Sequence, residues 1–159
     1  PALKVVLDIH RDSGKTREQS LVQIDGQAVA PILFIVGSDA RRPFPNWRQN
    51  YDFAVRLSER INQRYPGLSL GVRVKDGLYN QFLHPRAVLV EMGTTENSTE
   101  EAACSARLLA GILAELLAEI LAGEATVPEE PGSEPGFETV WQKSWKGRQE
   151  PENLHCAQV

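Results

Sequence analysis

Two polar side chains in this sequence stand where they could do chemistry. One apolar run ends in His10, which Asp8 and Asp12 flank, and a second apolar run ends in Glu91. Zinc favours an imidazole among carboxylates, and a further carboxylate can take a proton from water beside the metal. These residue types indicate a hydrolytic metal site, although a lone histidine after a strand is more often structural.

The same residues also allow plainer interpretations. Glu91 could face solvent at the end of a strand, or it could pair with an arginine such as Arg11 or Arg86. His84 precedes a proline in an irregular stretch, so we interpret it as a loop residue rather than a ligand. The residue types alone therefore do not establish a site.

Buried strands must position the histidine and the carboxylate. Residues 3–9 are nearly all Leu, Val and Ile, which is typical of a central strand buried on both faces of a parallel sheet. Residues 86–91 repeat the pattern. Ligands of such sheets bind beyond the carboxyl ends of the strands, so we expect His10 and Glu91 to share one site.

Turn and cap residues place the remaining elements. Asp25 and Gly26 predict a hairpin, Asn46 is a candidate N-cap, and Ser98 with Glu101 has the spacing of a capping box. The expected elements are a hairpin of 21–24 and 29–36, a helix over 47–65, a strand over 70–74 and a helix over 99–122. Their alternation predicts an α/β sandwich.

Composition indicates one domain and a tail. A chain of 159 residues with 42% hydrophobic residues can build one core, which we place in 1–122. Residues 123–159, which include Trp141 and Trp145, lack periodicity and are expected to be disordered or loosely docked. A net charge of -4 argues against a nucleic-acid partner. The leucine-rich stretch 108–121 contains two glutamates, so we expect no membrane span.

A series of motifs makes the pattern more specific. In order, they are VLDIHRDS (6–13), VGSD (36–39), NW (46–47), RYPGL (64–68), YNQ (79–81), PRAVLVEMG (85–93) and NSTEEA (97–102). Together they strongly resemble the stage II sporulation protein P family, from the start of the chain to about residue 121. That family is related to zinc-dependent N-acetylmuramoyl-L-alanine amidases of bacterial cell walls.

The resemblance implies a fold, a reaction and partners. The fold would be an α/β three-layer sandwich with a mixed, largely parallel sheet flanked by helices. His10 would be a Zn²⁺ ligand and Glu91 the catalytic carboxylate in zinc-assisted hydrolysis of the bond between N-acetylmuramic acid and L-alanine, with stem-peptide cross-links as a further target. We add Asp12, Arg86 and Asn97 as substrate-binding positions in the groove. The implied partners are peptidoglycan, a lytic transglycosylase and membrane engulfment proteins, and the implied location is extracytoplasmic, with the full-length protein anchored in the membrane.

The sequence departs from the family pattern at its front. A preceding strand and helix should supply a second His and a Glu as further zinc ligands, and neither motif is present. Because the chain begins at Pro1, we expect the N-terminal part of the catalytic domain and the membrane anchor to lie outside it. The alternatives are an inactive peptidoglycan-binding or scaffold module and another zinc hydrolase, such as a deacetylase or carboxypeptidase.

Overall fold

A computed structural model describes residues 3–125 of the chain. Its elements are β1 (Val6–Asp12), β2 (Val22–Ile24), β3 (Gln27–Val29), β4 (Ile32–Gly37), α1 (Trp47–Arg64), β5 (Ser69–Lys75), the short 3₁₀ helix η1 (Gln81–Leu83), β6 (Ala87–Thr94) and α2 (Thr99–Ala125). Most of the expected tail, including Trp141 and Trp145, lies outside the described residues. None of the described helices is long and apolar enough to span a bilayer.

The main sheet is mixed. Its strand order is β1-β6-β4-β5, in which β1 runs parallel to β6, β4 runs parallel to β5, and β4 runs antiparallel to β6. The predicted α/β class with a mixed, largely parallel sheet is confirmed. The carboxyl ends of β1 and β6 therefore meet at one end of the sheet, and those of β4 and β5 at the other.

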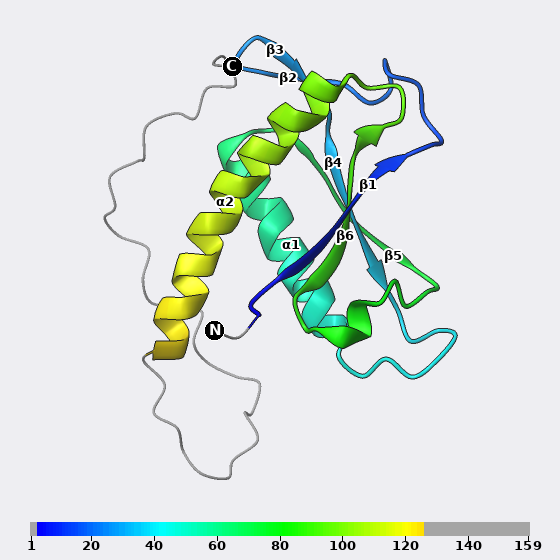
Figure 1. The fold of residues 1–159 in the computed structure, drawn as a ribbon, viewed down its shortest axis with the longest axis vertical. Coiled ribbons are helices and arrows are strands. Elements are labelled where there is room, and N and C mark those ends of the chain that lie inside the picture. The colour runs from blue at the N-terminus through cyan, green and yellow to red at the C-terminus, as the bar shows by residue number, and fades with distance from the viewer. Residues whose placement is uncertain (1–2, 126–159) are drawn as a thin grey trace.

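Both helices cover the same face of this sheet (Figure 1). Alternate residues of β4 and β6, among them Phe34 and Val90, pack with α1 and α2 in the main hydrophobic core. The residues between them, Leu33, Ile35 and Leu89, form a separate small cluster on the other face. The described part of the chain thus builds two layers, and we call the face away from the helices the open face.

β1 is one of the two edge strands of the sheet that residues 3–125 form, so the prediction of a central strand buried on both faces is wrong for this part of the chain. Within the described residues β1 pairs only with β6. Val6 is 37% exposed and Ile9 is 50% exposed. A run of apolar residues indicates that a strand prefers burial, but it does not indicate how many strands lie next to it in the sheet.

The predicted hairpin exists but is shorter than expected. β2 and β3 pair across Asp25 and Gly26, which both have positive φ, as a tight two-residue turn requires. The predicted strand over 29–36 is divided at Ala30 and Pro31, since Pro31 has no N–H to donate to a ladder. Its second half becomes β4 in the main sheet.

α1 matches its predicted range to within one residue. Phe53, Ala54, Leu57 and Ile61 form its buried stripe. Asn46 occupies the N-cap position, but its side chain makes no capping hydrogen bond. The helix is therefore held mainly by packing on the sheet rather than by its cap.

α2 begins with the predicted capping box. The Glu101 N–H donates to Ser98 Oγ at 3.1 Å, and the Ser98 N–H donates to Glu101 Oε2 at 3.0 Å. The helix continues past its predicted end at residue 122 to Ala125, with Gly123 inside it. A single glycine costs a helix only about 1 kcal/mol, which packing can offset.

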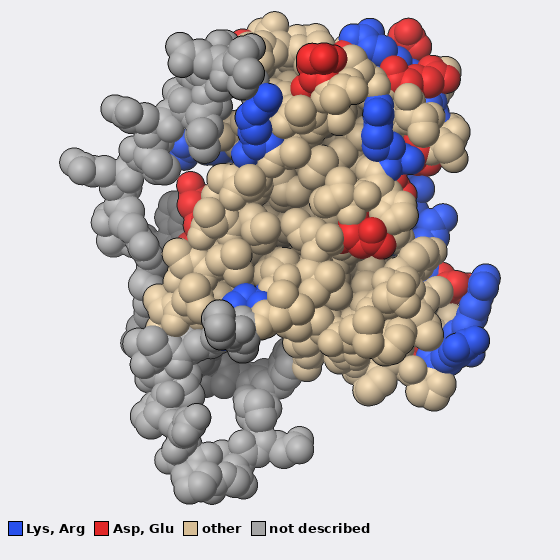
Figure 2. Space-filling view, in the orientation of Figure 1, with Lys and Arg blue, Asp and Glu red and all other residues tan. Residues whose placement is uncertain are grey.

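Charged side chains are spread unevenly over the surface. In the orientation of Figure 1, much of the middle of the visible face is uncharged, and Lys, Arg, Asp and Glu side chains lie mainly around its rim, with dense groups at the upper right and the lower right (Figure 2). The polar groups of the candidate site belong to the end of the sheet where β1 and β6 finish.

Candidate active site

His10 and Glu91 are direct neighbours across the parallel pair of β1 and β6. Leu33 of β4 faces Glu91 from the other side, so Glu91 lies on the open face between Leu33 and His10. The strands extend to Asp12 and Thr94, so His10 and Glu91 lie within strands. The sequence had predicted that both would follow the ends of their strands. The sheet register brings the imidazole and the carboxylate together.

His10 is half exposed and is paired with a carboxylate on its own strand. Its Nε2 lies 2.9 Å from Asp8 Oδ1, and the two side chains are 48% and 57% exposed. Residues two apart on a strand point to the same face, which explains the contact. An imidazole held by a carboxylate through one ring nitrogen has a fixed orientation, as a ligand or proton-transfer group needs.

Glu91 carries the feature expected of a general base. Its Oε2 is buried and has no hydrogen-bond partner among residues 3–125. Burial raises the pKa of the Glu91 carboxyl, the negative charges of Asp12 and Asp8 raise it further, and His10 opposes the rise. A carboxylate whose pKa is raised binds a proton more readily than an ordinary glutamate does.

Neither of the two arginines considered as partners of Glu91 is placed to pair with it: Arg11 bonds to backbone carbonyls, and Arg86 lies far from Glu91. Arg11 donates from Nε to Thr94 O at 2.9 Å and from Nη2 to Asn97 O. Arg86 precedes the amino end of β6, about 16 Å along the strand from Glu91, and interacts electrostatically with Arg56 of α1. The structure therefore does not bring Arg86 to the site.

Asp12 and Asn97 both lie at the His10 end of the sheet, in different environments. Asp12 is half buried, its Oδ1 accepts from the Gly14 N–H at 3.2 Å, and its charge acts on Glu91. Asn97 is 4% exposed, and its side-chain amide bonds to other parts of the protein. Asp12 remains a prediction for substrate contact, and Asn97 would have to exchange internal bonds to touch a substrate.

The described residues do not complete a metal site. No group of three His, Cys, Asp or Glu side chains among residues 3–125 is arranged to hold a metal ion. His84 lies before the amino end of β6, where its Nδ1 accepts from the Arg86 N–H at 3.0 Å. His10 with Asp8 fits part of a zinc-binding set, and the rest would have to come from other residues.

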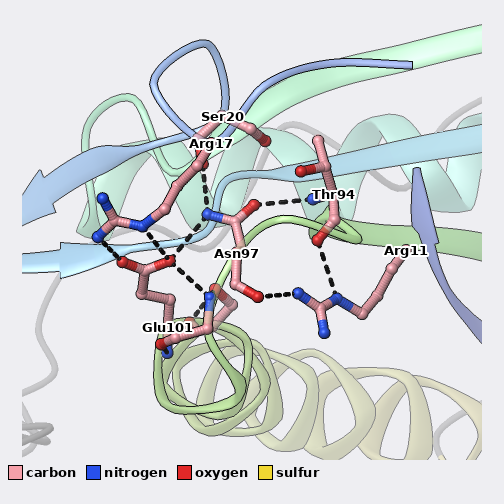
Figure 3. Close-up of polar contacts among 8 residues, drawn as sticks. Arg11, Arg17, Ser20, Thr94, Asn97 and Glu101 are labelled. Atoms are coloured by element: carbon pink, nitrogen blue, oxygen red, sulfur yellow. Dashed lines mark hydrogen bonds and ion pairs between the residues drawn. The ribbon is translucent and has the colours of Figure 1, made fainter. Parts of the chain in front are cut away.

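A partly buried polar network next to the site was not predicted from the sequence. Arg17 forms an ion pair with Glu101 that also includes a 3.3 Å bond from Arg17 Nε to Glu101 Oε2 (Figure 3). Asn97 Nδ2 donates to the same Oε2 at 3.0 Å. The capping box identifies Glu101, but no local signal links it to Arg17, 84 positions away.

Glu101 should make the protein sensitive to acid. The hydrogen bond from Arg17 is the main cause that lowers the pKa of Glu101 from 4.5 to about 2, helped by bonds from Asn97 and Ser98. Because the pKa is lower in the folded state, the stabilisation is present above about pH 4.5 and lost as the pH falls toward 2. Glu101→Gln should lower the free energy of unfolding at pH 7 by about 1–2 kcal/mol, allowing for the exposure of Arg17.

Urea unfolding of wild type and variant between pH 7 and pH 2.5 measures this effect. The difference between them should shrink as the pH falls. Glu100→Gln, on the exposed side of the same helical turn, is the control and should change stability little. An equal difference at both pH values would show that the charge of Glu101 is not the cause.

A hollow in the surface lies away from this site. It has a volume of about 540 Å³ and is lined by residues 39–45, which include Arg41 and Arg42. This loop follows β4, which runs antiparallel to β6, so the hollow belongs to the opposite end of the sheet from Thr94. It cannot contribute to chemistry at His10 and Glu91.

Fold and site define an α/β protein that carries a histidine and a buried carboxylate side by side on the open face of a mixed sheet. The model of the family "Stage II sporulation protein P" matches residues 1–114, and the chain belongs to this family. It is therefore a sporulation-related protein.

A curated relative supports the assignment. The chain is similar to Stage II sporulation protein P of Bacillus subtilis (strain 168), with 38% identity over 104 residues that cover 62% of this chain and 25% of the relative. The chain thus spans about a quarter of the length of that relative. No solved structure matches the chain.

Proposed function

We propose that this chain forms part of the catalytic domain of a peptidoglycan hydrolase that cleaves the amide bond between N-acetylmuramic acid and L-alanine during sporulation. The observation that carries the proposal is the pairing of His10 with Glu91, whose buried Oε2 has no hydrogen-bond partner within the described part of the chain. A buried, unpartnered carboxylate oxygen is costly to keep unless a substrate or another reacting group uses it. Family membership supplies the sporulation context.

Glu91 would act as general base and then as general acid. Its carboxylate would take a proton from the water that attacks the amide carbonyl, and it would return that proton to the leaving amine of L-alanine. Burial and the negative charges of Asp8 and Asp12 favour the protonated form after the first transfer. Glu91 alone therefore both accepts the proton of the attacking water and delivers it to the leaving amine.

His10 would be one ligand of a zinc ion in the full-length protein. Zinc supplies Lewis-acid assistance to the attacking water and to the amide carbonyl. Asp8 would hold the imidazole in place from its own strand. Because the described residues offer only part of a ligand set, the remaining ligands would come from residues outside that part of the protein.

Digestion of purified sacculi by the full-length protein tests the reaction. We expect mass spectrometry to show glycan strands with a free lactyl carboxylate and stem peptides with a free L-alanine amine. A chelator should stop the release and added zinc should restore it. Products cut only at stem-peptide cross-links would contradict the proposed bond, and products of both kinds would extend the activity to cross-links.

The alternative is an inactive module that binds peptidoglycan or acts as a scaffold, and the incomplete ligand set favours it. It predicts cosedimentation with sacculi and no soluble product, with or without zinc. We also propose an extracytoplasmic, membrane-anchored full-length protein that works beside a lytic transglycosylase and membrane engulfment proteins. Proteolysis of intact sporulating cells tests the location.

A further inference from the structure

The end of β1 is held by the sheet along one edge only within the described residues, where it pairs with β6. After His10 the register with β6 shifts, so that Asp12 pairs with Thr94 instead of Gly93. An irregularity of this kind interrupts the regular ladder of hydrogen bonds directly beside the candidate site. One backbone bond follows it, from the Thr95 N–H to Asp12 O at 2.8 Å. Further contacts from side chains can fix the strand at this point.

Arg11 supplies such a contact from the other face of the sheet. The Arg11 guanidinium reaches the segment between β6 and α2, and α2 covers the face of the sheet opposite the open face. Its guanidinium donates to the backbone carbonyls of Thr94 and Asn97 at once (Figure 3). A planar guanidinium can make two such bonds from a single position. Arg11 therefore ties β1 to the segment that follows β6.

Asn97 holds the same segment in shape. Its Oδ1 accepts from the Thr94 N–H at 2.8 Å, and its Nδ2 donates to Ser20 O at 2.7 Å and to Glu101 Oε2 at 3.0 Å. The amide is buried, and both of its ends are satisfied inside the protein. The Thr94 carbonyl that Arg11 uses is thereby kept in one place.

Gly93 shows how closely this segment is packed. Its φ is +64°, and a Cβ at this position would collide with Asn97 Oδ1 and lie 2.7 Å from Ala30 Cβ. Only glycine lets the chain turn here beneath the Asn97 amide. This turn comes two residues after Glu91, so the packing that fixes Gly93 also limits movement at Glu91.

We propose that Arg11 and Asn97 are positioning residues, which hold His10 on the edge strand at a fixed place beside Glu91. We call these two residues the clamp. Arg11 joins β1 to the backbone carbonyls of Thr94 and Asn97, and the Asn97 side chain holds the Thr94 N–H. The clamp therefore acts through the backbone at the end of β6 rather than on the reacting groups. Its effect on catalysis rests on the proposed function, but its effect on the strand does not.

The test compares substitutions of two different arginines in the full-length protein. Arg11→Met removes the clamp bonds and keeps the length of the side chain. Arg60→Met is the matched control, because Arg60 Nη2 bonds both carboxylate oxygens of Glu119 at 2.9 and 2.8 Å and joins α1 to α2 away from the site. Both variants lose bonds of a charged arginine, so both should lose similar global stability.

Two readouts separate positioning from general stability. At a temperature well below both midpoints, hydrogen exchange of the segment 6–12 should be about 10-fold faster in Arg11→Met, as the loss of about 1.5 kcal/mol of local bonding implies, and unchanged in Arg60→Met. The kcat on muropeptides should fall about 10- to 100-fold in Arg11→Met with little change in KM. Arg11→Lys, which keeps one donor group, should recover part of both losses.

Unchanged exchange of the segment 6–12 in Arg11→Met would overturn the proposal. So would an equal loss of kcat in Arg60→Met, because the effect would then follow global stability. If the wild-type protein released no muropeptide, the proposed function would fail, and the exchange measurement would still decide whether the clamp holds β1.

Discussion

Glu91→Gln is expected to slow muropeptide release by the full-length protein about 10²- to 10⁴-fold, the usual contribution of a general base. Glutamine keeps the shape of the side chain but cannot take the proton of the attacking water. KM should change little, because the carboxylate acts on water rather than on the distant parts of the substrate. Initial rates on purified sacculi, followed by mass spectrometry of the released products, measure the effect.

The same variant should be at least as thermally stable as wild type at neutral pH. The pKa of Glu91 is raised in the folded state, so its ionised form destabilises the fold once the pH exceeds the pKa of the unfolded chain. A neutral amide removes that cost. Glu59→Gln, on the exposed side of α1, is the control and should keep the wild-type rate. Equal rates in wild type and Glu91→Gln would remove Glu91 from the mechanism.

His10→Ala is expected to weaken zinc binding by the full-length protein by about 100-fold or more, since even residues behind the ligands contribute 10- to 100-fold. The variant removes the only imidazole near Glu91 among the described residues. Competition with a coloured chelator measures the affinity, and elemental analysis measures the stoichiometry.

His84→Ala is the control for this experiment. His84 is also partly exposed, but it lies before the amino end of β6, where its ring bonds to the backbone. Its loss should leave zinc affinity unchanged. Unchanged affinity and stoichiometry in His10→Ala would show that His10 is not a ligand, and a loss in His84→Ala alone would move the metal to the other end of the sheet.

Local signals predicted the local elements of the fold. The pair Asp25-Gly26 specifies a tight turn whatever surrounds it, and Ser98 with Glu101 satisfies the first turn of α2 from within it. The position of β1 in the sheet was missed, because strand order depends on partners remote in sequence. Apolar composition cannot distinguish an edge strand from a central one.

The pairing of His10 with Glu91 was predicted for a partly mistaken reason. Both were expected after the ends of parallel strands, and they are neighbours instead because β1 and β6 pair in a register that aligns them inside the strands. The bonds of Arg11 were not predictable, since their acceptors are backbone carbonyls of a distant segment and leave no side-chain pattern in the sequence.

The pairing of the first strand with the last has a consequence for how the protein folds. Arg11 and Thr94 are 83 positions apart, and the ladder that aligns His10 with Glu91 joins the same two segments. Closing so long a loop costs chain entropy before any contact rewards it, and structures rich in such contacts fold slowly. The histidine and the carboxylate can meet only after the segment between them has been synthesised and this loop has closed. Chains that have not yet closed it therefore carry no assembled site.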